Sequence, residues 1–220
     1  MTLTTENIVL AKCHVGNLKK ETNPKTRRYW LDTQENMVII NPDAIKEQLE
    51  NARKKFEEAK AQKKEILIIC ESPLYAEEIA ALSTKKGVHY MNQKIPSGFL
   101  TNFDTLISRI KAMNELKSFI ESDSFASLTK KEQLTTKRKL KKIEEVYGGV
   151  KNLRKSPDLI IVIDGKSMVK FVDEVSKTRK DSIVLASTNF DRWIPEENLV
   201  VTNVYSFSAL DFSIKYILNS

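Results

Sequence analysis

The chain has 220 residues, of which 41% are hydrophobic and 30% charged, and its formal net charge is +7 at pH 7. This length and composition are typical of a globular chain that can bury a proper core, and they exclude an intrinsically disordered one. Two cysteines provide no disulfide framework, which indicates a reducing compartment, and without a run of 18 apolar residues we expect no membrane span.

The N-terminal segment, from Met1 to Asn7, contains neither the basic stretch nor the apolar core of a secretory signal. We therefore expect a cytoplasmic protein. A mature organellar protein would have the same features, so an organelle stays open as the location.

A basic loop, residues 12–30, ends on the aromatic pair Tyr29 and Trp30. It contains six Lys or Arg side chains and one Glu, a local net charge of +5. Clustered cations neutralise phosphates with release of counterions, and aromatic or Arg planes stack on unpaired bases. The pattern favours RNA as the ligand, the alternative being a solvated surface.

Within this loop we assign the cations to phosphates and the flanking residues to shaping the chain. Asn23 and Pro24 should form an extended turn that presents the cations, because Pro disfavours helix in the residue before it. Tyr29 or Trp30 either stacks on a base or packs the loop onto the body, and packing is favoured for Trp30. The RNA-binding candidates here are Lys19, Lys20, Asn23, Lys25, Arg27 and Arg28.

From residue 37 onward, short apolar runs alternate with helical patterns. Several runs lack polar alternation, which is typical of strands buried on both faces of a parallel sheet. The order predicts a right-handed, three-layer α/β fold with a mainly parallel sheet, of flavodoxin-like or Rossmann-like kind. The predicted strands are 37–40, 66–70, 88–91, 159–163, 183–186 and 199–202, and the predicted helices are 42–62, 74–86, 167–180 and 206–218.

Residues 101–147 interrupt this alternation and predict an inserted helical hairpin. Apolar residues recur at spacings of three and four from 103 to 120, a narrow seam on one long helix, and residues 122–124 supply a turn. We expect Gly148 and Gly149 to end the returning helix in the left-handed conformation. The seam residues are Phe103, Leu106, Ile110, Met113, Leu116 and Ile120, then Leu140, Ile143 and Val146.

The hairpin divides the chain into an α/β core, residues 1–100 and 148–220, and an insertion, residues 101–147. Thr101 and Asn102 are expected to cap the first hairpin helix and to offer backbone amides to phosphate. Residues 129–142 carry seven cations and one Glu, a net charge of +6, either for RNA or as a solvated face. The further RNA-binding candidates are Lys130, Lys131, Lys137, Arg138 and Lys141 on the hairpin, and Lys151, Arg154 and Lys155 after it.

Motifs for nucleotide, metal or hydrolytic chemistry are absent from the sequence. It contains neither GxGxxG nor GxxxxGK[ST], and neither histidine lies near a GxSxG turn. Cys13, His14, Cys70 and His89 have no metal-ligand spacing. We therefore predict no enzyme activity, cofactor or metal, a buried Cys70 and a structural His89, and leave the roles of Cys13 and His14 open.

Six short motifs, spread from about Ile8 to Ile217, resemble the bacterial-type S2 family of small-subunit ribosomal proteins in order and in spacing. Residues 14–16 (HVG) resemble the family's HFG, 23–25 (NPK) its NPK, 98–103 (GFLTNF) the end of its GGTLTNF, 148–151 (GGVK) its GGIK, 157–164 its PDALFVVD and 188–191 (TNFD) its TNCD. The hairpin also occupies the family's place. Departures from the pattern include Asn17 for a second His, Ile95 for a Trp, Ser97 for a Gly, Gly165 for a Pro and Ser187 for an Asp.

The resemblance implies a non-enzymatic structural constituent of the small ribosomal subunit. It would bind small-subunit rRNA where head and body meet, beside neighbouring ribosomal proteins and with the mRNA-binding protein S1 as a candidate partner, and would use no membrane or small-molecule substrate. Two alternatives stay open. A small-molecule-binding enzyme on a flavodoxin-like fold would need a pocket with converging polar groups at the strand ends, and a coiled-coil interaction protein would use residues 103–146 without RNA.

Overall fold

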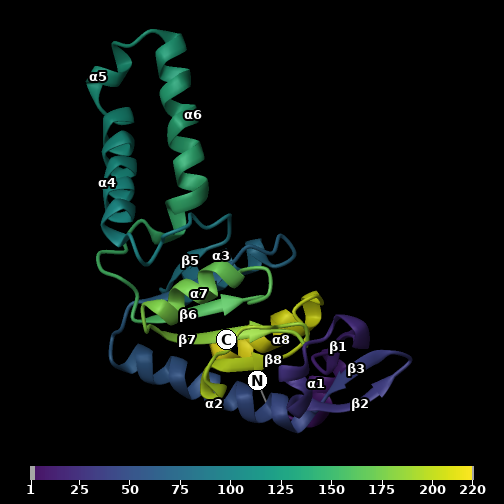
Figure 1. The fold of residues 1–220 in the computed structure, drawn as a ribbon. Helices are drawn as coiled ribbons and strands as arrows, with labels where there is room; N and C mark the ends of the chain where they lie inside the picture. The colour runs from purple at the N-terminus through teal and green to yellow at the C-terminus, as the bar shows by residue number, and fades with distance from the viewer. Residues whose placement is uncertain (1–2, 220) are drawn as a thin grey trace.

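The computed structural model describes residues 3–219 as an α/β body from which a long helical hairpin projects (Figure 1). Met1 and Thr2, which belong to the segment examined for a secretory signal, lie outside the described residues. Within residues 3–219, no helix combines the length and the apolar character needed to cross a bilayer.

The body is built on a five-stranded parallel sheet in the order β5-β4-β6-β7-β8. Its two central neighbours, β4 and β6, are apolar and fully buried along their whole length, which is why they lack polar alternation in the sequence. They pair in register from Ile66 opposite Leu159 to Cys70 opposite Ile163. The strands are β4 (Ile66–Cys70), β5 (His89–Met91), β6 (Leu159–Ile163), β7 (Asp181–Ala186) and β8 (Leu199–Val201).

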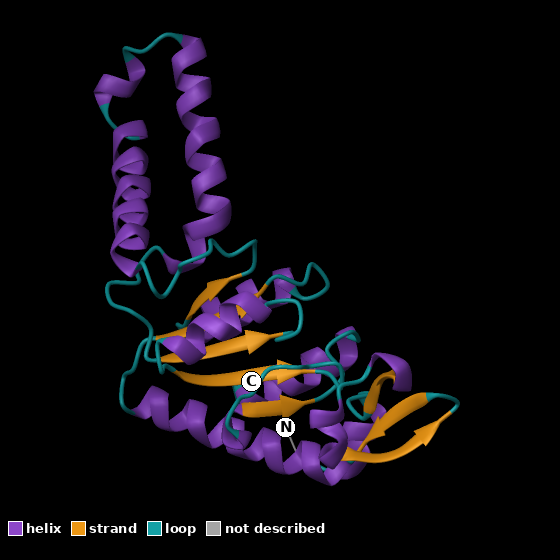
Figure 2. Cartoon of the chain, in the orientation of Figure 1, coloured by secondary structure: helices purple, strands orange, loops and turns teal. Residues whose placement is uncertain are grey.

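Helices cover both faces of this sheet (Figure 2). On one face lie α2 (Pro42–Ala61), α3 (Ala76–Lys86) and α8 (Phe207–Ile217), and α7 (Val169–Lys177) covers the other. The Tyr75 hydroxyl, at the start of α3, donates to Asp211 of α8 at 2.9 Å, so these two helices are joined by a polar contact as well as by packing. The predicted three-layer, mainly parallel α/β fold is confirmed.

One predicted strand belongs to a different sheet. Residues Met37–Ile40 form β3, which pairs antiparallel with β1 (Val15–Leu18) and β2 (Trp30–Gln34) in a small sheet that follows α1 (Thr5–Leu10). Glu35 and Asn36 both have positive φ, 47° and 66°, which makes the β2–β3 connection a tight hairpin turn. The alternation of strands and helices predicted β3 in the parallel sheet, and this prediction is wrong. The β2–β3 turn contains no glycine, so the sequence lacks the usual signal of a hairpin at this point.

The hairpin consists of α4 (Phe103–Ile120) and α6 (Lys130–Tyr147), joined through the short helix α5 (Asp123–Ala126) where we expected only a turn. The predicted seam is confirmed: Leu106, Ile110 and Met113 are buried and the seam of α6 is partly buried. These side chains are continuous with the core of the body, so the base of the hairpin is packed and only its distal part stands free.

The glycine pair at the end of α6 acts differently from our prediction. Gly148 is right-handed, with φ −57°, and among the described glycines only Gly87 and Gly98 have positive φ. A Cβ atom at Gly149 would lie 2.2 Å from the carbonyl oxygen of Tyr90 in β5. The left-handed helix end is therefore wrong, and the physical reason for glycine at 149 is the close approach of η3 (Gly148–Val150) to β5.

Gly149→Ala should therefore lower the free energy of unfolding by about 1–3 kcal/mol, since the added methyl group forces the backbone of β5 to move. Gly148→Ala is the matched control, because no atom beyond its chain neighbours and its own helix lies within 4 Å of its Cβ position and its backbone is helical. Urea denaturation of both variants measures the difference, and equal midpoints would contradict the close-approach explanation.

Candidate RNA interface

Thr188, just after the carboxyl end of β7, makes three hydrogen bonds to the basic loop. Its carbonyl oxygen accepts hydrogen bonds from the Asn23 amide at 2.8 Å and the Thr26 hydroxyl at 2.9 Å, and its own hydroxyl accepts from the Asn17 amide at 2.9 Å. Gly16 passes so close that a Cβ atom would lie 2.9 Å from Cγ2 of Thr188. The motif segments 14–16 and 23–25 thus form one structural unit with the remote segment 188–191.

Two departures from the S2 pattern are direct neighbours in this unit. The Ser187 hydroxyl donates to Oδ1 of Asn17 at 2.5 Å, and the Thr188 hydroxyl lies 3.2 Å from the same oxygen. Positions 17 and 187, where the family pattern has His and Asp, therefore carry a neutral hydrogen-bonded pair in this chain.

The cations of the loop are presented by two short 3-10 helices, η1 (Lys19–Glu21) and η2 (Pro24–Tyr29). Asn23 is extended, as predicted, with φ −97° and ψ 131°, and its side chain caps η2 by accepting from the Lys25 amide. Lys19, Lys20 and Arg27 are exposed and make no ion pair with another described residue, which leaves their charge available to a ligand.

Two other cations of the loop are partly engaged with the body. Lys25 Nζ donates to the carbonyl oxygen of Asp191 at 3.2 Å, and Arg28 forms an ion pair with Glu196. The Arg28 guanidinium also lies 4.8 Å from the centroid of the Tyr29 ring. Both side chains remain exposed, so a phosphate could still reach them.

The aromatic pair at the end of the loop packs within the protein. Tyr29 is buried, and Trp30 is half-buried with its indole N–H donating to the Thr26 hydroxyl at 3.1 Å. Since Thr26 is also bonded to Thr188, the indole belongs to the same anchor. Trp30 therefore has the packing role that the sequence analysis favoured.

The backbone amides just before α4, which we expected to meet phosphate, donate instead to a buried carboxylate. Oε1 of Glu174 accepts from the amides of Leu100 and Thr101, at 2.6 and 2.7 Å, and from the Thr101 hydroxyl at 3.0 Å. Asn102 stands at the cap position without a capping bond and accepts from the Thr105 hydroxyl instead. The predicted caps are wrong, because this segment is anchored to α7, and RNA contact by Thr101 and Asn102 stays a prediction.

The cations of the hairpin lie far from the basic loop. Figure 1 shows the hairpin and the β1–β3 sheet at opposite ends of the molecule. All the candidates on α6 are exposed, as are Lys151 and Arg154 near its base, whereas Lys155 forms an ion pair with Asp158 at 2.9 Å. The structure therefore separates the predicted cations into distinct groups, and one ligand that touches all of them must be extended.

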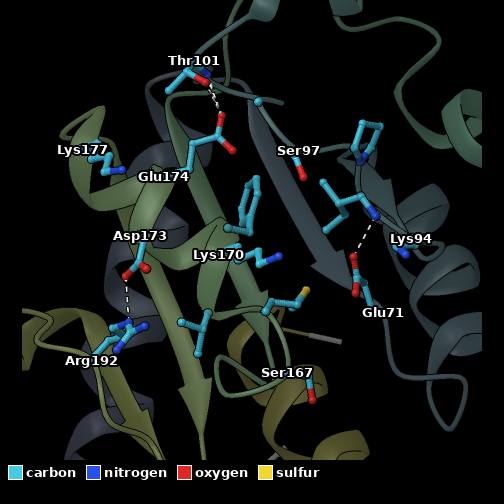
Figure 3. A pocket seen from close by; sticks show the side chains of 16 residues that line it. Glu71, Lys94, Ser97, Thr101, Ser167, Lys170, Asp173, Glu174, Lys177 and Arg192 are labelled. Carbon is cyan, nitrogen blue, oxygen red and sulfur yellow. Dashed lines mark hydrogen bonds and ion pairs between the residues drawn. The ribbon is translucent and has the colours of Figure 1, made fainter.

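A cavity of about 790 Å³ lies between α7 and the segment 94–101 (Figure 3). Its acidic side chains are engaged: Glu71 accepts from the Ile95 amide at 2.7 Å, Asp173 pairs with Arg192 at 2.9 Å, and Glu174 holds Thr101. The cations that also line it were missed, because Lys94, Lys170, Lys177 and Arg192 are scattered through the sequence. Its lining contains neither histidine nor cysteine, so a His-based nucleophile pair is not formed there.

The two cysteines and two histidines are held by the fold. Cys13 is buried against the Ala209 carbonyl and the Ser213 hydroxyl, both 3.7 Å from its sulfur. Cys70 is buried as predicted, and burial raises the pKa of its thiol to about 11. His89 lies 2.8 Å from Glu65, in the structural role predicted for it, and burial lowers the pKa of His14. Among residues 3–219, no three His, Cys, Asp or Glu side chains come together as a metal site.

A doubly wound α/β body carries many unrelated functions, so the fold and the exposed cations do not define the class of protein by themselves. The family model of Ribosomal protein S2 matches residues 8–216, nearly the whole chain. The chain belongs to the ribosomal protein S2 family.

Three curated relatives are each named small ribosomal subunit protein uS2. The protein from Coprothermobacter proteolyticus is 31% identical, over 86% of this chain and 70% of the relative. Those from Gloeobacter violaceus and Petrotoga mobilis are 30% and 28% identical, over 82% and 84% of this chain and 66% and 65% of the relatives. The chain thus spans about two thirds of the length of the relatives it matches.

Both thiols should be unreactive in the native protein, since a buried thiol with a raised pKa is neither accessible nor ionised near pH 8. We expect a disulfide reagent such as DTNB to label Cys13 and Cys70 only after urea is added. Rapid labelling of either residue at pH 8 without denaturant, in protein with a native circular dichroism spectrum, would contradict the burial described above.

Proposed function

We propose that this protein is a structural constituent of the small ribosomal subunit, where it binds small-subunit rRNA and neighbouring ribosomal proteins and supports translation without catalysing a reaction. The observation that carries the proposal is the family match over residues 8–216, together with three family motifs that meet at Thr188 and display a basic loop. We place the protein at the head–body junction of the subunit, in a cytoplasmic or an organellar ribosome. The family resemblance also makes the mRNA-binding protein S1 a candidate partner.

We assign the first rRNA contact to the basic loop. Its exposed cations Lys19, Lys20 and Arg27 are free of ion pairs among the described residues, and Lys25 and Arg28 are exposed beside them. Because Thr188 holds the loop in one conformation, little conformational entropy is lost when it meets a phosphate backbone. This arrangement supports phosphate recognition by position rather than base-specific reading.

We assign the second contact to the hairpin, residues 101–147, as an arm inserted into the α/β core of residues 1–100 and 148–220. The base of the arm packs on the core, whereas its distal half presents α6 cations to solvent. The excess positive charge of α6 lowers the stability of the helix, because like charges at neighbouring positions repel one another. A bound polyanion removes that repulsion. Lys151 and Arg154 extend this surface at the base of the arm.

Replacing Arg27 and Arg28 with Glu should weaken binding to protein-free small-subunit rRNA and flatten its salt dependence. Each lost phosphate contact removes roughly one unit from the slope of log K against log salt. Filter binding at several salt concentrations measures both effects.

The control for that experiment is the charge-matched pair Lys63→Glu and Lys64→Glu, in the exposed turn between α2 and β4. It changes the net charge by the same amount, away from the loop. If both double variants lose affinity and slope equally, the effect is one of net charge and the basic loop is not the rRNA site.

Replacing residues 117–135 with a short Gly/Ser linker should leave a cooperatively melting body, because the buried seam residues Leu106, Ile110 and Met113 are retained. Incorporation into small subunits should fall, since Lys130 and Lys131 are removed with the distal arm. A full-length variant with Lys130→Gln and Lys131→Gln separates the loss of charge from the loss of length. Normal incorporation of both variants would show that the distal arm does not contact the subunit.

A further inference from the structure

Trp193 is the most exposed of the large hydrophobic side chains in the described part of the chain, with 78% of its surface accessible. Phe190, three residues before it, and Ile194, the next residue, are buried, at 1% and 7% exposure. The backbone of this segment is therefore anchored, and the anchoring directs the indole outward. A ring of this size would normally be buried, because it is among the largest apolar surfaces a side chain can remove from water.

The segment around Trp193 is fixed from two sides by polar contacts. Asp191 pairs with Lys166 at 2.9 Å and accepts from Lys25 of the basic loop through its carbonyl oxygen. Arg192 pairs with Asp173 of α7 at 2.9 Å, as Figure 3 shows. The indole is thus presented on a pre-formed support, so a ligand that covers it loses little entropy in ordering the protein.

A cavity of about 560 Å³ lies beside the indole, between the basic loop and residues 190–199. Its charged lining is made of three cations, Lys25, Arg28 and Arg192, and two acids, Glu196 and Glu197. Arg28 already pairs with Glu196 and Arg192 with Asp173, and both guanidinium groups stay partly exposed, so Lys25 is the lining cation without an ion pair among the described residues. The free cations Lys19, Lys20 and Arg27 belong to the same loop.

We propose that Trp193 is the stacking platform for one unpaired base of single-stranded RNA, with Lys25 and Arg192 beside it for the flanking phosphates. Every base has a flat face, so an exposed indole can accept it whatever the sequence, and the cations hold the backbone. An apolar protein segment would cover the indole but would gain nothing from the surrounding positive charge. The inference rests on the proposed rRNA-binding function and adds a base contact to its phosphate contacts.

The test uses the full chain and its two tryptophans, Trp30 and Trp193. In the wild-type protein, protein-free small-subunit rRNA should quench part of the tryptophan emission, and Trp193→Phe, which retains Trp30, should lose that part of the quenching. Trp193→Ala should weaken rRNA affinity by about 5- to 150-fold, the range for the loss of one stacked base, and Trp193→Phe should lose less because it keeps a ring. Since the indole is exposed, the melting temperature should not change.

Inorganic polyphosphate is the matched probe, because it has the charge of RNA and no bases. It should bind wild type and Trp193→Ala equally and should not quench Trp193. Equal rRNA affinity of wild type and Trp193→Ala, with no quenching, would overturn the stacking site while leaving the proposed function intact. Quenching only after neighbouring ribosomal proteins are added would also overturn it, in favour of a protein partner. If the wild type binds no rRNA, the proposed function itself fails.

Discussion

Residues 12–30 have almost no core of their own, since Cys13, Thr26 and Tyr29 are their only buried members. The shape of the basic loop therefore depends on hydrogen bonds, and those to Thr188 are central to it. Each such bond adds only about 0.5–1.5 kcal/mol, but all converge on one residue at the end of β7. Because β7 is an interior strand whose last residues pair with β8 and whose preceding residues pair with β6, its end is a rigid support. The loop inherits its position from the parallel sheet, which lies far away in the sequence.

Acidic and basic side chains have different roles on this protein. Glu71, Asp173, Glu174 and Glu196 are each bonded to a backbone amide or to a cation, whereas several lysines and Arg27 have no anionic partner among residues 3–219. These four acidic side chains thus serve the fold, and the unpaired cations are left for a ligand. A net charge of only +7 produces strongly basic regions because residues 12–30 and 129–142 carry local charges of +5 and +6.

The hairpin and the basic loop are stabilised by different interactions. The loop needs a fixed geometry and obtains it from hydrogen bonds, whereas the hairpin needs reach and obtains it from a seam that α4 and α6 bury against each other. At its base the arm depends on one close approach, Gly149 against Tyr90, where any side chain would separate η3 from β5. An extended polyanion such as rRNA suits two contact regions at opposite ends of one body.

Local patterns were sufficient to predict most of the elements. Apolar runs without alternation identified β4 and β6, the spacing of three and four identified the α4 seam, and six short motifs identified the family. These features depend on neighbours within a few turns or residues, and that is the range over which sequence periodicity carries information.

Contacts between remote segments were decided only by the tertiary structure. These contacts join residues whose separation in the sequence has no periodic signal. They are the pairing of β3 in the small sheet, the bonds of Glu174 to Thr101, the close approach at Gly149 and the neutral pair Asn17–Ser187. Trp193 is the clearest case. Its sequence neighbours Phe190 and Ile194 are as apolar as it is, and only the packing of the folded chain decides which of the three side chains are buried and which is left in water.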